Sequence, residues 1–239
     1  MFTAQGPTFR ELAVQALSSV ERGYDLLAPK FDHTPFRTPD LVLDSVTRAL
    51  RPLGPFSSGL DLCCGTGAGM GVLRELCRDR ITGVDLSAGM LAVARERSER
   101  DAPNARWVRG DARALPFSPV FDLVVSFGAF GHFLPREQPG LFAQVHSVLR
   151  PGGRFAFPLP APARPGSRGY WTLLGFDSAM RVRNALWRPP FVMYYRAVRP
   201  SAVTEALRRT GFSVELYALP ELGRLPDGSP RCRMVVATR

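Results

Sequence analysis

The 239-residue chain lacks several of the signals that would mark an unusual protein class. It has four cysteines, and their spacing does not match a zinc site. Its longest apolar candidate, residues 121–134, contains Asp122 and His132 and falls short of the roughly 20 residues that cross a bilayer. No charged-then-apolar segment of the kind that directs secretion opens the chain. We therefore expect a cytoplasmic protein with reduced cysteines, no structural metal and no membrane partner.

Lysine is almost missing, because Lys30 is the only one among 31 basic residues, and the formal net charge is +10. A charge of this size can indicate an anionic partner such as nucleic acid. The arginines are scattered from Arg10 to Arg239 and form no single stripe, and a compositional bias toward arginine accounts for them without a partner. Nucleic acid is therefore the minor alternative.

The most informative segment that is present covers residues 60–69 and reads LDLCCGTGAG. An apolar run with an early acid leads into a glycine turn, and a helical pattern begins at about Met70. This order is typical of a parallel strand that turns into a helix whose N-terminus faces a ligand. Gly65 and Gly67 let the backbone approach that ligand closely. The segment predicts a site for a nucleoside-containing cofactor.

Two further acids stand where the next strands are expected to end. Asp85 follows the apolar run 81–84, about 20 residues after the glycines, where a carboxylate can bind ribose hydroxyls. Asp111 closes a third segment, WVRGDA, at 107–112. Met70 occupies the third glycine position of a GxGxxG motif, so the pattern differs from that of a nicotinamide site.

Four ordered motifs over residues 60–157 resemble those of class I S-adenosylmethionine-dependent methyltransferases. They read LDLCCGTG, ITGVDLSAGML, GDARALPF and FDLVVSFGAFGHF, and VLRPGGRF closes the series. The resemblance implies S-adenosyl-L-methionine as cofactor and S-adenosyl-L-homocysteine as product. Cys63 departs from the family, in which many members have glycine at this position. Because cysteine is small and apolar enough to end a buried strand, we expect cofactor binding to survive.

The pattern predicts an α/β fold. Strands expected at 58–62, 80–84, 105–109, 121–127 and 154–158 alternate with helices at 69–78, 88–100 and 139–149, which indicates a parallel sheet with helices on both faces. A helix at 201–210, with Ser201 as its N-cap, and strands at 212–217 and 232–238 follow. The resemblance implies a Rossmann-like, seven-stranded, mostly parallel sheet whose last strand is antiparallel.

We expect one methyltransferase domain over residues 1–239, in four parts. These are an N-terminal helical cap (1–56), a cofactor-binding core (57–158), a lid or substrate insertion (159–200) and a C-terminal helix and strand pair (201–239). The cap should hold a helix at about 8–22 and another near 40–51. In the insertion, prolines at 158–165 preclude regular structure, and 191–195 has the composition of a strand. Its aromatic residues favour a substrate lid over a packing extension.

The resemblance also implies which residues hold the cofactor. Asp85 would accept both ribose hydroxyls and Asp111 the adenine amine, while Asp61 would meet the methionine ammonium through a water or the turn backbone. The full implied set is Asp61, Cys63, Gly65, Gly67, Asp85, Leu86, Met90, Asp111, Ala112 and Phe127, with Tyr24 from the cap. The candidates for substrate binding are Phe31, Trp171, Trp187 and Tyr194. Tyr24 and Phe31 could equally well pack the cap onto the core.

His132 is the candidate catalytic base, because it follows the fourth strand at the carboxyl edge of the sheet and neutral imidazole suits a hydroxyl or amine acceptor. It could equally shape its loop by bonding the backbone. The chain lacks the NPPY and Pro-Cys sequences that resemble nucleic-acid methyltransferases, and the acids of magnesium-dependent ones. We expect metal-independent O-, N- or C-methylation of a small molecule by a monomer or homodimer. The alternatives are methylation of RNA or protein, or cofactor binding without methyl transfer.

Overall fold

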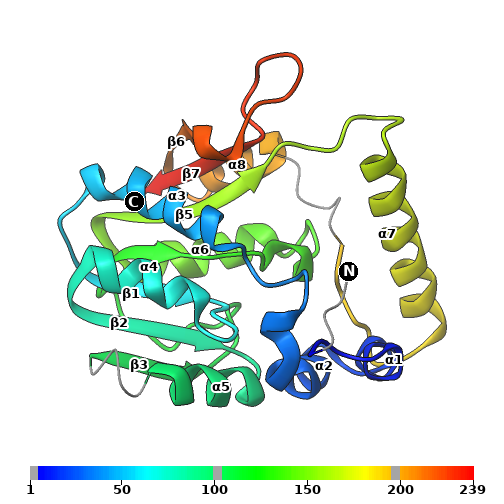
Figure 1. The fold of residues 1–239 in the computed structure, drawn as a ribbon. Helices are drawn as coiled ribbons and strands as arrows, with labels where there is room; N and C mark the ends of the chain where they lie inside the picture. Colours follow the sequence, from blue (N-terminus) through cyan, green and yellow to red (C-terminus); the bar gives the residue numbers. More distant parts are fainter. Residues whose placement is uncertain (1–4, 99–103, 195–199) are drawn as a thin grey trace.

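The computed structural model describes residues 5–98, 104–194 and 200–239. Its centre is a seven-stranded sheet with the order β3-β2-β1-β4-β5-β7-β6 (Figure 1). Strand β7 is antiparallel to β5 and β6, and the other neighbours are parallel, which confirms the predicted fold. The strands are β1 (Phe56–Leu62), β2 (Cys77–Asp85), β3 (Ala105–Arg109), β4 (Phe121–Val125), β5 (Leu149–Pro160), β6 (Ser213–Ala218) and β7 (Cys232–Thr238).

Helices cover both faces of the sheet and enclose two apolar cores. Helices α3 (Asp40–Leu50) and α4 (Ala68–Leu76) bury one face, with Val46 and Leu73 fully inside. Helices α6 (Gln138–Val148) and α8 (Pro200–Arg209) bury the other, where Phe142 and Leu207 pack against Phe155. Helix α5 (Ala88–Ser98) runs beside β3 at the edge of the sheet (Figure 1). This double covering is what permits a parallel sheet.

The N-terminal cap contains two helices where the sequence predicted one over 8–22. Helices α1 (Phe9–Leu17) and α2 (Val20–Leu27) are separated at Ser18 and Ser19, and the Ser19 hydroxyl accepts a hydrogen bond from Arg22 N. A serine that caps a new helix competes with continuation of the old one, so the chain turns between them. The 3-10 helix η1 (Ala28–His33) follows, and the predicted helix near 40–51 forms as α3.

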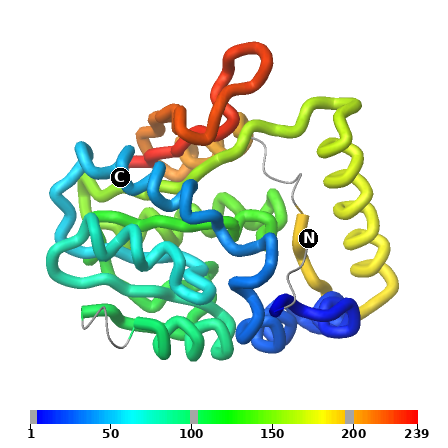
Figure 2. The backbone as a smooth tube through the Cα atoms, in the orientation of Figure 1, coloured from blue at the N-terminus to red at the C-terminus, as the bar shows by residue number. Residues whose placement is uncertain are grey.

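The insertion is more regular than the sequence predicted. Helix α7 (Arg168–Leu186) fills most of it and stands apart from the sheet, on the same side as α1 and α2 (Figures 1 and 2). Ser167 caps this helix, just after the prolines that end at 165. The strand predicted at 191–195 is wrong for 191–194, which follow an irregular path, and Tyr195 lies outside the described residues. Tyr194 N bonds Gly131 O at 2.8 Å and thereby ties this path to the core.

Two boundaries also differ from the prediction. Helix α8 begins at Pro200, so Ser201 lies inside the helix and is not its N-cap. Strand β5 already begins at Leu149, where the sequence predicted the last residue of a helix. Among the described residues, no helix is both long and apolar enough to cross a bilayer.

Candidate functional site

A cavity of about 650 Å³ opens at the carboxyl ends of the parallel strands. This volume is within the usual range for small-molecule sites. The loops that follow β1, β2, β3 and β4 form one side, and the cap and insertion form the other. Because the strand order reverses between β1 and β4, the cavity lies at the place where doubly wound folds bind ligands.

The turn after β1 is tight and left-handed. Cys63, Gly65 and Gly67 have φ of 58°, 53° and 90°, and Gly67 leads directly into α4. A side chain at Gly65 would meet no atom within 4 Å, so its backbone faces open space at the cavity. Cys63 also lines the cavity, in a conformation that favours glycine. This explains why glycine is common at its position in the family that the sequence resembles.

Asp85 joins the turn after β1 to the turn after β2. Its Oδ2 accepts a hydrogen bond from Gly65 N at 2.8 Å, and its Oδ1 accepts one from Ser87 N at 2.9 Å. Burial raises the pKa of Asp85, and these backbone hydrogen bonds act in the opposite direction. A carboxylate offers about four lone-pair positions, so acceptor capacity remains for hydroxyl groups in the cavity.

Asp61 lies directly beneath the glycine turn and does not line the cavity itself. It is 1% exposed, and its Oδ2 has no hydrogen-bond partner among the described residues. Burial, and then the charge of Asp85, raise the pKa of Asp61 well above its ordinary value. A buried carboxyl oxygen without a partner fits a site that receives a cationic or hydrogen-bond-donating ligand.

Asp111 and Ala112 line the cavity after β3, but Asp111 already has a partner that the sequence did not predict. Arg113 holds its carboxylate, with Nη2 at 2.8 Å from Oδ2 and Nε at 3.0 Å from Oδ1. Arg113 also reaches Glu137 at 3.2 Å. Although partial burial raises the pKa of Asp111, the Arg113 hydrogen bonds outweigh it and lower that pKa.

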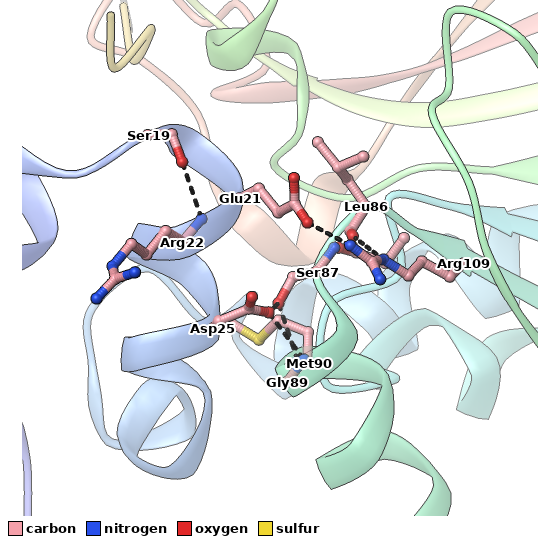
Figure 3. Close-up of polar contacts among 10 residues, drawn as sticks. Ser19, Glu21, Arg22, Asp25, Leu86, Ser87, Gly89, Met90 and Arg109 are labelled. Carbon is pink, nitrogen blue, oxygen red and sulfur yellow. Dashed lines mark hydrogen bonds and ion pairs between the residues drawn. The ribbon is translucent and has the colours of Figure 1, made fainter. Parts of the chain in front are cut away.

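Helix α2 lies on the cap side of the cavity, and two of its acids bind the core through contacts that the sequence analysis missed (Figure 3). Asp25 Oδ1 accepts hydrogen bonds from Ser87 Oγ at 2.6 Å and from Gly89 N at 2.8 Å. Glu21, one turn earlier on the same face, forms an ion pair with Arg109 at the end of β3. The signal in the sequence was the four-residue spacing of the two acids, which places both on one side of a helix.

Tyr24 and His132 meet inside the cavity. The Tyr24 hydroxyl lies 2.8 Å from His132 Nε2, and His132 Nδ1 lies 2.7 Å from the carbonyl oxygen of Val192. A carbonyl can only accept, so Nδ1 carries the proton and Nε2 accepts from Tyr24. Burial lowers the pKa of His132, and the imidazole is therefore neutral near pH 7.

The structure brings only one of the four predicted substrate-binding residues to the cavity. Phe31 lines it and packs edge-on against Tyr24, with 6.2 Å between ring centroids. Trp171 and Trp187 are 60% and 51% exposed and lie away from it. Tyr194 is 5% exposed, because its hydroxyl turns to Asn184 at 2.8 Å. The apolar wall is formed instead by Pro35, Phe36, Phe133, Leu134, Val192 and Met193.

Three more of the residues predicted to hold the cofactor line the cavity. Leu86 and Met90 line the cavity after β2, and Phe127 lines it after β4. Gly67 does not line this cavity, and a side chain at its position would come within 2.9 Å of the Trp107 ring. No group of side chains in the described part of the chain is arranged to hold a metal ion.

Comparison with known proteins finds methyltransferases. The family described as "Methyltransferase domain" matches residues 60–153. The demethylmenaquinone methyltransferase of Thermus thermophilus is 33% identical over 171 residues, which cover 67% of this chain and 76% of that protein. The 2-phytyl-1,4-naphtoquinone methyltransferase of Thermosynechococcus vestitus is 38% identical over 102 residues, or 42% of this chain and 44% of that protein.

Solved structures share the fold. A complex of DhpI with S-adenosylhomocysteine superposes with a TM-score of 0.66 at 20% identity, covering 96% of this chain and 98% of that one. The chain spans about half the length of several curated relatives that it matches, such as 44%, 42% and 40% for three of them. The motifs, the strand order and the similarity to the Thermus protein together show that the chain belongs to the S-adenosylmethionine-dependent methyltransferases.

Proposed function

We propose that the protein transfers a methyl group from S-adenosyl-L-methionine to a small organic acceptor at oxygen, nitrogen or carbon, without a metal ion. The observation that carries the proposal is one continuous cavity with two different sides. Its strand-end side has the turns and acids of a cofactor site, and its cap side has apolar walls around a neutral histidine. Such a cavity can hold two molecules in contact with each other.

The residues present fit the cofactor. Asp85 has acceptor capacity for ribose hydroxyls, the open backbone at Gly65 permits close approach, and Leu86 and Met90 provide apolar walls for a flat ring. The unpartnered oxygen of Asp61 fits the ammonium end, either through water or through the turn. When bound, the cofactor supplies an electrophilic methyl group on a positively charged sulfur. Asp111 would have to share its carboxylate between Arg113 and the adenine amine.

The chain itself contributes mainly alignment and exclusion of water. Holding two reactants in line can contribute about 7–11 kcal/mol to lowering a barrier. Phe31, Phe133 and Met193 shield the acceptor side of the cavity from solvent. His132 accepts the proton that a protic acceptor must lose, which adds a factor of about 10²–10⁴.

The apolar cap side favours an acceptor with a flat, partly apolar body. Two of the relatives act, by their names, on a phytyl-naphthoquinone and on demethylmenaquinone. Hydroxylated naphthalenes are therefore sensible first probes for this chain. Methylation of RNA or protein is the second candidate, and it rests on the net charge of +10 alone.

The first experiment is calorimetric titration with S-adenosyl-L-methionine and S-adenosyl-L-homocysteine, with NAD as control. Binding of the first two alone supports the proposal, and preference for NAD would overturn it. Transfer of labelled methyl to 1,4-dihydroxynaphthalene, bulk RNA and a basic carrier protein then separates the acceptor classes. Salt-sensitive transfer to RNA would replace the small-molecule acceptor. Tight cofactor binding with transfer to none of these, nor to other small hydroxyl or amine probes, would favour a non-methylating protein.

We further propose that the four parts of the chain work as one domain in the cytoplasm, as a monomer or homodimer without nucleic acid. The four cysteines are free and mostly buried, which suits a reducing compartment. Size-exclusion chromatography with light scattering gives the assembly state. A mass above that of a dimer would contradict this part of the proposal.

A further inference from the structure

The loop between β4 and α6 runs along the acceptor side of the cavity. It contains the 3-10 helix η3 (Phe130–His132), whose last residue lines the cavity, and continues through Phe133, Leu134 and Arg136, which line it too. His132 and the two apolar side chains belong to the site already described. Arg136 has no role there, and it brings a permanent positive charge to the cavity wall.

A tight turn holds the backbone of Arg136 in place. Glu137 N donates to Leu134 O at 2.8 Å and closes a four-residue turn, in which Pro135 occupies the second position, where proline is favoured. The Glu137 carboxylate reaches back and accepts a hydrogen bond from Leu134 N at 2.7 Å. Two hydrogen bonds between the same two residues therefore brace the corner from which Arg136 meets the cavity.

The neighbouring charges on this side of the cavity are already paired. Glu137 Oε1 lies 3.2 Å from Arg113 Nη1, and Arg113 holds Asp111 through its other two nitrogens. Glu21, on α2, is held in an ion pair as well. Arg136, in contrast, forms no hydrogen bond or ion pair with any residue that the structure describes, although an acid follows it in the chain. Its guanidinium is the cation on this side that remains available to a ligand.

An available guanidinium beside an apolar wall fits a ligand that is itself anionic. Arginine presents two parallel N–H donors, which match the two oxygens of one carboxylate. The single charge of Arg136 balances that of a carboxylate. A phosphate dianion would need a second cation, and Arg113 is already committed to two acids. The chemistry of this wall therefore favours a carboxylate.

We propose that Arg136 determines the specificity of the enzyme by binding a carboxylate on the acceptor. The inference rests on the proposed function and narrows its acceptor to a partly apolar molecule that carries both a methylatable group and a carboxylate. The methylatable group faces His132, the apolar body lies against Phe133 and Leu134, and the carboxylate meets Arg136 at the other end of the same loop.

The first test compares two probes that differ only in a carboxylate, 1,4-dihydroxynaphthalene and 1,4-dihydroxynaphthalene-2-carboxylate. Calorimetry on protein saturated with S-adenosyl-L-homocysteine should show the carboxylated probe binding about 10-fold more tightly. This is the lower end for a hydrogen bond to a charged group, because Arg136 is exposed. Arg136→Gln should abolish the preference, Arg136→Lys should keep part of it, and Arg136→Glu should reverse it.

Arg208→Gln is the matched control. Arg208 is an exposed arginine on α8 that does not line the cavity, and its replacement removes the same charge. This variant should keep the preference for the carboxylated probe. An equal loss in Arg136→Gln and Arg208→Gln would reduce the preference to the net charge of +10 and overturn the inference. Equal affinity of the wild type for the two probes, or binding of neither, would also overturn it.

The second test is methyl transfer to the same two probes. Arg136→Gln should raise KM for the carboxylated probe about 10-fold more than KM for the other, because the lost contact concerns the carboxylate alone. An equal rise for both probes would mean that Arg136 only supports the turn, and it would overturn the proposed role. Failure of the wild type to bind S-adenosyl-L-homocysteine, which is measured before any acceptor is added, would instead refute the proposed function.

Discussion

Asp25 provides the sharpest test of how the cap is fixed to the core. Its carboxylate accepts two hydrogen bonds, and one of them comes from Gly89 N in the first turn of α5 (Figure 3). Amides in this turn have no partner within their own helix and need a cap. Ser87 Oγ accepts a hydrogen bond from a different amide, Met90 N, at 3.1 Å. Asp25→Ala would therefore leave the Gly89 amide without its acceptor.

The expected loss of stability follows from the hydrogen bonds that Asp25 accepts. A hydrogen bond to a charged group contributes about 1.5–3 kcal/mol, and loss of a helix cap costs about 0.5–2 kcal/mol. Because Asp25 is only partly buried, we take about 2 kcal/mol for Asp25→Ala. For a chain of this size that corresponds to a fall in Tm of about 4–8 °C. Asp25→Asn keeps a carbonyl acceptor and should lose less than half as much.

Asp44→Ala is the matched control. Asp44 is exposed on α3 and makes no hydrogen bond or ion pair with any described residue, so its removal should change Tm by less than about 2 °C. Differential scanning calorimetry of the three variants measures the effect. If Asp25→Ala melted together with Asp44→Ala, the hydrogen bonds of Asp25 would not hold the cap, and the account given for α2 would be wrong.

Four further outcomes follow from the site. Asp85→Ala removes the acceptor of Gly65 N and the group that we propose binds the ribose hydroxyls. Calorimetry should then show S-adenosyl-L-homocysteine binding at least about 10-fold weaker, and equal affinity would contradict the proposed site. A residue with a Cβ at φ 58° already bears strain of about 1–2 kcal/mol, so Cys63→Gly should relieve strain in chemical denaturation. Cys63→Val adds a β-branch there and should lower stability, and equal stability of the two variants would contradict the strained turn. Burial raises the pKa of the Asp61 carboxyl, so its ionised form destabilises the folded protein above pH 5. Asp61→Asn should therefore raise the Tm of the unloaded protein above pH 5 while weakening cofactor binding. A lower Tm would count against this prediction. Burial lowers the pKa of His132, so the unfolded chain binds the imidazole proton more readily and the folded protein loses stability as pH falls below about 6.5. His132→Gln should therefore make Tm fall less steeply with falling pH. An unchanged slope of Tm against pH would refute this prediction.

The core could be predicted because its signals are local. The turn at Gly65 and Gly67 and the acid at Asp85 each stand directly after a strand, and parallel strands bring such ends to one edge. Alternation of strands and helices then determined the layers. The predictions failed at helix ends that depend on one capping residue, such as Ser19. They also failed in the insertion, where the prolines were given too much weight and α7 was missed.

The cap side could not be predicted in the same way. Trp171 and Trp187 looked like lid residues because aromatic side chains gather at sites, yet both are exposed on or just after α7. Tyr194 turned into a local cluster with Asn184. How α7 and residues 191–194 pack depends on their contacts with α2, which lies more than 140 positions earlier in the chain. Periodicity within one segment carries no information on such pairings.

The two sides of the cavity differ in how far similarity to known methyltransferases extends to them. The family match ends at residue 153, and it contains Asp85, Asp111 and His132 but neither Tyr24 nor Val192. The strand-end residues proposed to hold the cofactor therefore lie mostly inside the family match, while the groups that orient His132 come from the cap and the insertion. A histidine at the same place in a relative would have a different tautomer or no hydroxyl partner if those segments differed. Tyr24 and Val192 both contact His132 from outside the family match, so their contacts are a further place where we expect this chain to determine its acceptor.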